Sequence, residues 1–292
     1  MTVLLVHHRT EYRYKRPVRL GDHRLMSRPR DSHDLRLLST TLDVTPVPSE
    51  IRWLHDVFGN SIAVSSFAVE ADTLVFDSTF RAEHFPMPER TIWIEPYAQT
   101  LPFSYDSADS ADLGCTKERQ YPDPENRISA WATYHVEANA GRNTLEIIVS
   151  MTKAIKAGFE YRYREAVGVQ SPLETLNLGS GSCRDFAVFL MEAVRSVGLA
   201  AEFVSGYLYD EKMIGASGGL VGSGSTHAWM QVYLPGAGWV EFDPTNALIG
   251  GRNLIRVAVA RDASQAAPLL GSFTGAKDDF LSMRVTVEVT AE

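Results

Sequence analysis

Three side chains in this sequence have the types that nucleophilic chemistry by a thiol requires: Cys183, His227 and Asp243. Cys183 follows a glycine-punctuated turn and opens a stretch whose apolar residues recur at three- and four-residue spacing as far as Gly198. This spacing predicts a helix that begins at Cys183. A thiol in that place lies where unpaired N–H groups and the positive end of the helix dipole favour its anion.

The turn before Cys183 bears on access to the sulfur. Its glycines would let backbone or substrate approach closely, and we therefore take Gly181 and Ser182 as candidates for a substrate cleft. Asp185, in the first turn of the predicted helix, is expected to support the helix N-terminus electrostatically. The alternative interpretation of Cys183 is structural, because free cysteine is among the most buried residue types.

His227 and Asp243 belong to a predicted β-hairpin. Side chains alternate along a strand, so His227 and Trp229 share a face that Asp243 can meet from the partner strand. If Tyr233 pairs with Trp239, Trp229 lies opposite Asp243 and His227 is its diagonal neighbour, with β-carbons roughly 5–8 Å apart. The carboxylate could then accept a hydrogen bond from one imidazole nitrogen and leave the other free. A register slip of one residue would turn Asp243 to the opposite face.

Each of these residues also has a structural interpretation. A lone strand histidine such as His227 is more often a satisfied core residue, and Asp243 before Pro244 could simply end its strand in an Asx turn. Trp229 is a candidate for the substrate cleft, although such a residue is more often core or cleft wall than a determinant of specificity. A helix-terminal thiol, a histidine and a carboxylate together nevertheless have the general form of an activated nucleophile.

Composition excludes several classes of function. The chain has 292 residues, 45% of them apolar and 22% charged, which is typical of a globular protein with one large or two modest domains. Its net charge of −8 argues against a nucleic-acid binder or an anionic-membrane binder. No apolar run approaches the roughly 20 residues of a membrane span, and the start lacks the features of a signal peptide. We therefore expect a cytoplasmic protein without a membrane partner.

The order of strand-like and helix-like segments predicts an α+β protein. The first part is β-rich, with short alternating runs between turn signals, and suggests a sandwich or barrel. Helical periodicity appears at 128–136 and 144–155, and Ser171 before Pro172 predicts the start of another helix. We divide the chain into a β-rich domain, a linker or insertion, a catalytic core and a C-terminal strand segment, at 1–105, 106–126, 127–270 and 271–292.

The two cysteines do not make a disulfide framework. Cys115 lies in a polar segment, residues 106–124, that is expected to be an exposed loop. We expect two free thiols, of which only Cys183 is placed to react.

Several motifs occur in a characteristic order. They are Gly181-x-Cys183-x-Asp185-x-Ala187, Gly206-Tyr207, His227-Ala-Trp229, and Trp239 followed by Asp243-Pro-Thr-Asn246. Together they resemble the transglutaminase-like superfamily of papain-like fold, whose bacterial members are often labelled cysteine proteases. Thr10-x-Tyr12-x-Tyr14, Arg28-Pro-Arg30 and Asp56-Val-Phe-Gly-Asn60 resemble the β-rich N-terminal region of these bacterial proteins, and residues 255–268 resemble their usual tail.

The resemblance implies a papain-like transglutaminase core preceded by a sandwich-like N-terminal domain. It also implies that Cys183, His227 and Asp243 are the nucleophile, base and orienting acid of the family's triad. Animal transglutaminases need calcium, but no run of carboxylates here is spaced like a calcium loop. We therefore expect neither a metal nor a cofactor.

These features predict a cysteine enzyme that acts on a peptide or amide substrate through a thioester, as a hydrolase of the peptidase or amidase type. An amine-crosslinking transglutaminase is the enzymatic alternative. A binding or scaffolding module that keeps the fold without turnover is the alternative of another class. The glycine-dense loop at 215–225, directly before His227, is either a mobile lid or a plain connection.

Overall fold

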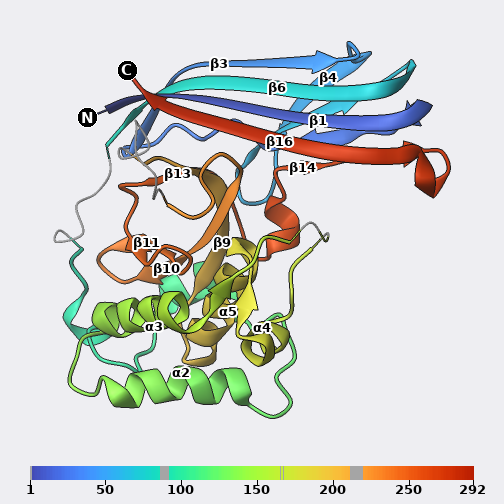
Figure 1. Cartoon of the computed structure of the whole chain (residues 1–292). Coiled ribbons are helices and arrows are strands. Elements are labelled where there is room, and N and C mark those ends of the chain that lie inside the picture. Colours follow the sequence, from blue (N-terminus) through green and yellow to red (C-terminus); the bar gives the residue numbers. More distant parts are fainter. Residues whose placement is uncertain (1, 86–91, 165, 167, 211–219) are drawn as a thin grey trace.

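The computed structural model describes residues 2–85, 92–164, 166, 168–210 and 220–292. The protein is α+β, as predicted, with a long β-sandwich on one side and a smaller sheet covered by helices on the other (Figure 1). In the part of the chain that is described, no helix is long and apolar enough to cross a membrane.

The sandwich is built from two antiparallel sheets. In the first, β6 (Glu70–His84) lies between β1 (Thr2–Leu20) and β3 (Leu35–Thr45). The second has the order β14 (Leu269–Leu270), β2 (His23–Leu25), β5 (Ser61–Ser66) and β4 (Glu50–His55). β1 has the period-two burial of a strand with one covered face, so alternate side chains point into the molecule. The predicted β-rich character of this region is confirmed.

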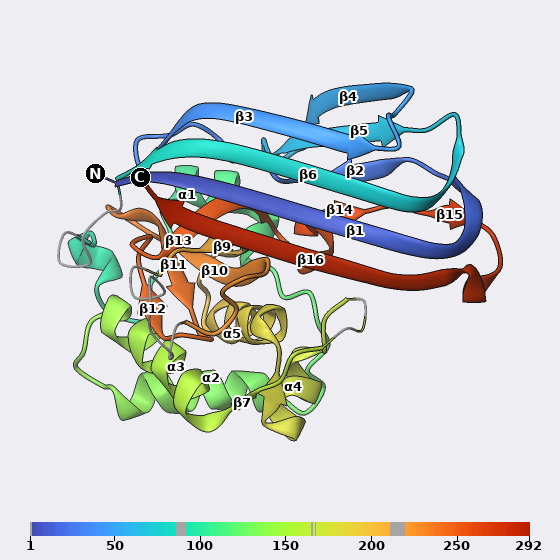
Figure 2. The same ribbon diagram turned by 45° about the horizontal axis from the view of Figure 1, so that its top comes forward.

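The end of the chain returns to the sheet in which it began. β16 (Phe280–Ala291) pairs antiparallel with β1 from Leu4 opposite Ala291 to Tyr14 opposite Phe280. β15 (Phe273–Thr274) continues this pairing farther along β1. Figure 2 shows β16 lying along β1, with both chain ends at the same edge of the sandwich. The C-terminal segment therefore completes the N-terminal sheet.

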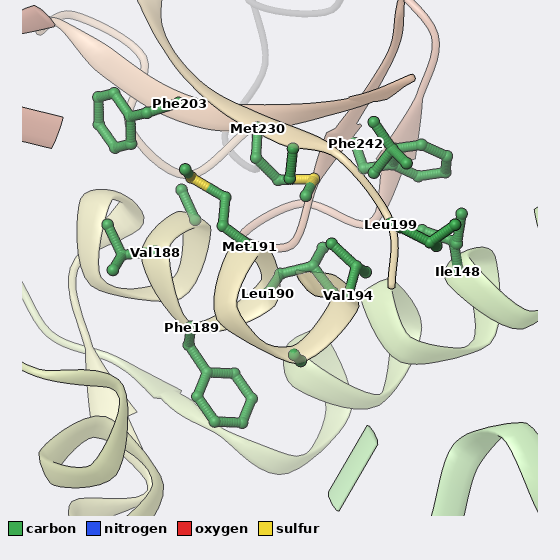
Figure 3. Packing of buried hydrophobic residues seen from close by; sticks show 14 of the residues in the cluster. Ile148, Val188, Phe189, Leu190, Met191, Val194, Leu199, Phe203, Met230 and Phe242 are labelled. Atoms are coloured by element: carbon green, nitrogen blue, oxygen red, sulfur yellow. The ribbon is translucent and has the colours of Figure 1, made fainter. Parts of the chain in front are cut away.

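A third antiparallel sheet, outside the sandwich, carries the residues of interest. Its order is β12 (Leu248–Ile249), β11 (Gly238–Asp243), β10 (His227–Leu234), β9 (Ala201–Leu208) and β13 (Leu254–Ala260). One face is covered by α5 (Cys183–Ser196), behind which lie α2 (Arg127–Ala138), α3 (Thr144–Gly158) and α4 (Pro172–Leu178). Figure 3 shows Leu190, Met191 and Val194 of α5 packed beneath Met230 of the sheet. The helices predicted at 128–136, 144–155 and from Cys183 are confirmed.

The opposite face of this sheet packs on the sandwich. Tyr207 of β9 and Ile255 of β13 form a buried apolar cluster with Leu4, Leu35 and Phe80 of the long strands. His8 of β1 is also buried there, and its Nδ1 lies 2.8 Å from the Tyr207 hydroxyl. The N-terminal sandwich thus supports the sheet from behind.

The segment predicted as an exposed loop at 106–124 contains ordered elements, which corrects that expectation. α1 (Ser107–Leu113) is capped by Asp106, whose carboxylate accepts the N–H of Asp109 at 2.8 Å, and η3 (Gly114–Lys117) follows. The buried Glu192 carboxylate of α5 accepts the backbone N–H groups of Gln120 and Tyr121. These hydrogen bonds anchor the segment on that helix. Cys115 is exposed, and both cysteines are free thiols, as expected.

The part of the chain that the structure describes also contains three other short 3-10 helices. They are η2 (Pro96–Ala98), η5 (Ala263–Ala266) and η6 (Lys277–Asp279).

Candidate active site

Cys183 is the first residue of α5, as the sequence predicts, and its side chain is partly exposed. The chain reaches it through β8 (Ser180–Gly181), which pairs in parallel with β7 (Glu160–Tyr161). Just before β8, Gly179 ends α4 with φ of 57°, a left-handed conformation that favours glycine. A short parallel bridge and a glycine cap therefore deliver the thiol to the start of the helix.

Asp185 was expected only to interact with the helix dipole, but it also forms several hydrogen bonds to the turn before Cys183. Its carboxylate accepts both the N–H and the hydroxyl of Ser182, at 2.8 and 2.7 Å. It also binds the Arg164 guanidinium with both oxygens, at 2.9 and 3.0 Å, and accepts the N–H of Gln170. Burial alone would raise the pKa of the Asp185 carboxyl. The hydrogen-bond donors, of which Arg164 contributes most, outweigh burial and hold this pKa below its ordinary value. Asp185 thus fixes Ser182, the residue that precedes Cys183.

The predicted register of the hairpin is confirmed. β10 and β11 pair from Tyr233 opposite Trp239 to the pair Met230–Phe242. His227 and Asp243 therefore share a face, and His227 Nε2 donates to Asp243 Oδ2 at 2.9 Å. Both side chains are fully buried. The carboxylate fixes the ring by one nitrogen and leaves Nδ1 as the nitrogen available to another partner.

Asp243 also forms the Asx turn that was the structural interpretation of this residue. Its Oδ1 accepts the N–H of Thr245 at 2.8 Å, while Oδ2 accepts from His227 and, at 2.9 Å, from Asn246 Nδ2. The two interpretations are therefore compatible, because the turn fixes one oxygen and so aims the other at the imidazole. These donors, with His227 contributing most, hold the pKa of Asp243 below its ordinary value despite its burial.

The imidazole of His227 is held in its charged form. Burial disfavours the cation, but the Asp243 carboxylate and, after it, the Cys183 sulfur raise the pKa of His227 to about 10. Nδ1 is buried and has no hydrogen-bond partner among the described residues. The ring is thus within electrostatic reach of Cys183, and the nitrogen that does not contact Asp243 remains free for the sulfur.

The three residues predicted for a substrate cleft are buried in the structure and make structural contacts. Gly181 is buried, and a β-carbon on it would lie 2.9 Å from the β-carbon of Asp185, so packing against the helix explains this glycine. Ser182 is buried with its hydroxyl bound to Asp185. Trp229 is fully buried, nearly parallel to the His227 ring with centroids 5.9 Å apart, and its Nε1 donates to Glu241.

Three other residues adjoin the site and were not singled out from the sequence. Tyr161 of β7 lies opposite Gly181, and burial together with the neighbouring Cys183 sulfur raises the pKa of Tyr161 to about 12. Gly222 lies against the His227 ring, and Asn246 contacts Asp243. Asn246 belongs to the Asp243-Pro-Thr-Asn246 motif, which was the available signal for it. Tyr161 and Gly222 carry no local signal.

The loop considered as a lid, 215–225, lies partly outside the described residues, since the structure describes it only from Leu220 onward. Among the residues that are described, no cluster of three or more His, Cys, Asp or Glu side chains could hold a metal ion.

Comparison with known families agrees with this fold. Residues 132–244 match the model of the transglutaminase-like superfamily, and residues 4–83 match that of the bacterial transglutaminase-like N-terminal region. The chain thus contains a transglutaminase-like core and a bacterial transglutaminase-like N-terminal region. The resemblance inferred from the sequence motifs is thereby confirmed, for the core and for the N-terminal region alike.

Similar sequences and a similar solved structure cover nearly the whole chain. Uncharacterized proteins from Mycobacterium tuberculosis and Mycobacterium leprae share 27% and 26% identity with this chain, over 97% of it and over 91% and 96% of their own lengths. A crystal structure from Cytophaga hutchinsonii, described as a "putative cysteine protease", has a TM-score of 0.71 and 20% identity. That alignment covers 99% of this chain and 90% of the other, and it confirms the predicted fold.

Proposed function

We propose that this transglutaminase-like protein is a cysteine hydrolase that cleaves an amide or peptide bond through a thioester on Cys183. The observation that carries the proposal is the setting of the His227 ring. Its Nε2 is bound to a buried carboxylate at 2.9 Å, and the ring also interacts with the Cys183 sulfur. A thiol beside an imidazole that a carboxylate orients is the general arrangement of an activated nucleophile.

The first half of the proposed reaction acylates the sulfur. Because the imidazolium is the resting form of His227, the thiol proton already lies on Nδ1, and the thiolate attacks the carbonyl carbon, forming a C–S bond and a tetrahedral oxyanion. When the oxyanion collapses, the C–N bond breaks and the imidazolium proton from Nδ1 goes to the leaving amine nitrogen. Asp243 keeps the imidazolium oriented and charged at neutral pH, which agrees with the pKa of about 10 for His227.

The second half releases the acyl group. A water molecule gives its proton to Nδ1 and attacks the thioester carbon, and the C–S bond then breaks to return the thiolate and the imidazolium. The N–H groups at the start of α5 are donors suited to stabilise the oxyanion in both halves. The hydroxyl of Tyr161 is a further donor beside Cys183, and with a pKa of about 12 it keeps its proton at neutral pH.

An acyl donor that does not depend on the physiological substrate tests this proposal. The Cys115→Ser chain is incubated with 4-nitrophenyl acetate and a fluorescent primary amine, with Cys183→Ser in the same background as the control. We expect turnover that depends on Cys183 and yields acetate, with no acetylated amine. Formation of the acetylated amine would instead establish an amine transferase. Equal nitrophenol release by the protein with and without Cys183 would support a scaffold without turnover.

A further inference from the structure

The loop that precedes β10 lies directly against the reactive edge of His227. Gly222, in this loop, has φ of 98°, and a β-carbon built on it would lie 2.7 Å from Nδ1 and 3.3 Å from Cε1 of the ring. The bare α-carbon of Gly222 thus covers the edge of the imidazole opposite Asp243. This contact accounts for the burial of Nδ1, which lacks a hydrogen-bond partner among the described residues.

Asn246 ties this loop to the carboxylate that orients the ring. Its Oδ1 accepts the N–H of Val221 at 2.9 Å, and its Nδ2 donates to the carbonyl of Val221 at 3.0 Å. The same Nδ2 donates to Asp243 Oδ2 at 2.9 Å. One side-chain amide therefore fixes both the residue before Gly222 and the carboxylate at the other edge of the imidazole.

The ring consequently lies between two groups that share one support. Asp243 holds Nε2, Gly222 covers Nδ1, and Asn246 sets the distance between them. Any side chain larger than hydrogen at position 222 would occupy the space through which Nδ1 exchanges a proton.

We propose that Asn246 and Gly222 are positioning residues for proton transfer between Cys183 and His227. Asn246 locks the loop onto Asp243, and Gly222 encloses the Nδ1 edge without blocking it. This inference rests on the proposed function, because it assigns these residues to the proton transfer from the thiol to Nδ1 and from Nδ1 to the leaving amine.

Gly224 provides a matched control for Gly222. It lies in the same loop with φ of 84°, but a β-carbon on it would meet no atom within 4 Å. Gly222→Ala and Gly224→Ala therefore bear a similar backbone strain, and only the first places a methyl group against the imidazole. The rate at which iodoacetamide alkylates Cys183 near pH 6, in the Cys115→Ser background, reports on the thiolate–imidazolium pair without requiring a substrate.

We expect Gly222→Ala to slow this alkylation by roughly a hundredfold, the lower end of what proton transfer by a positioned group contributes, and Gly224→Ala to leave it nearly unchanged. Equal rates for the two variants would overturn the inference. The proposed function has a separate readout, because it requires Cys183 of the parent chain to react much faster near pH 6 than Cys115 does in a Cys183→Ser chain. Its failure would be seen there, before any loop variant is compared.

Asn246→Asp tests the other half of the inference and decides the matter if Gly222→Ala does not fold. The variant keeps the shape of the side chain but replaces the donating NH₂ by an oxygen that faces both Asp243 and the Val221 carbonyl. We expect slower alkylation at neutral pH, with the rate relative to the parent chain recovering as the pH falls and the new carboxyl gains a proton to donate. A ratio that stays near one, or is lowered equally at every pH, would contradict the assigned role.

Discussion

Replacing Asp243 by asparagine should leave the fold intact and severely reduce turnover. The carboxylate accepts Thr245 N–H with one oxygen and accepts from His227 and Asn246 with the other. An asparagine has only one side-chain oxygen, so in either orientation its NH₂ group faces at least one of these donors. The variant also removes the negative charge beside the ring.

The size of the effect follows from the electrostatics of His227. Burial alone would lower its pKa, whereas Asp243, followed by Cys183, raises it from 6.5 to about 10. A tenfold change in an equilibrium corresponds to about 1.4 kcal/mol, so this interval represents up to roughly 5 kcal/mol in favour of the imidazolium. Without the carboxylate, the largest contribution that raises the pKa of His227 is lost, while burial still opposes the cation. We expect turnover to fall by about 10³- to 10⁴-fold, as for other bases that lose their orienting acid.

The assay measures kcat/KM for 4-nitrophenyl acetate against pH in the Cys115→Ser background. Asp278→Asn is the matched control, because this carboxylate is 78% exposed and lies in the sandwich, paired with Lys15. Thermal unfolding of each variant shows that the fold is retained. Turnover by Asp243→Asn within a few-fold of the parent chain at neutral pH, with an unchanged pH profile, would refute the role given to this carboxylate.

Three further predictions concern the scaffold. Burial lowers the pKa of His8 to about 4, whereas the unfolded chain binds this proton near pH 6.5. The free energy of unfolding should therefore fall by up to about 3 kcal/mol as the pH decreases from about 6.5 to about 4. His8→Gln should make this decline smaller in urea titrations. An undiminished decline in that variant would exclude His8 as its source. Gly206→Ala should destabilise the fold by about 3 kcal/mol or more, because its β-carbon would lie 2.1 Å from a backbone carbonyl oxygen, whereas Gly158→Ala, with no neighbour within 4 Å, is the matched control. Similar melting temperatures for the two alanine variants would contradict this account. Glu192→Ala should cost about 3–5 kcal/mol, since it leaves Arg195 buried without its carboxylate; a loss below about 1 kcal/mol in denaturant titrations would show that water compensates the arginine.

Local patterns were sufficient to predict the pieces of the site. The three- and four-residue spacing after Cys183 defined the helix and its first residue. Period-two alternation and a glycine-rich turn predicted the hairpin, and with Tyr233 opposite Trp239 they placed His227 and Asp243 on one face; the structure has this pairing. In both cases the relevant residues are close in sequence, so a short pattern contains the information.

Contacts between distant segments were not predictable in this way. Asn246 binds Val221, and Gly222 packs on His227, but nothing in a glycine-dense stretch marks which glycine meets a ring. Gly181 was predicted to let substrate approach the sulfur, and in the structure the absence of a side chain makes room for Asp185. A glycine in the sequence does not distinguish these two reasons. The pairing of β16 with β1 likewise joins opposite ends of the chain, and no local pattern contains that information.

The central claim is that Cys183 becomes acylated because His227 activates it. Peptide mapping by mass spectrometry after brief exposure of the Cys115→Ser chain to 4-nitrophenyl acetate tests it directly. We predict a transient acetyl thioester on Cys183 that disappears with turnover and does not form at a comparable rate in the His227→Ala variant. A thioester that forms equally fast without the imidazole, or an acetyl group found elsewhere while Cys183 stays unmodified, would contradict the account.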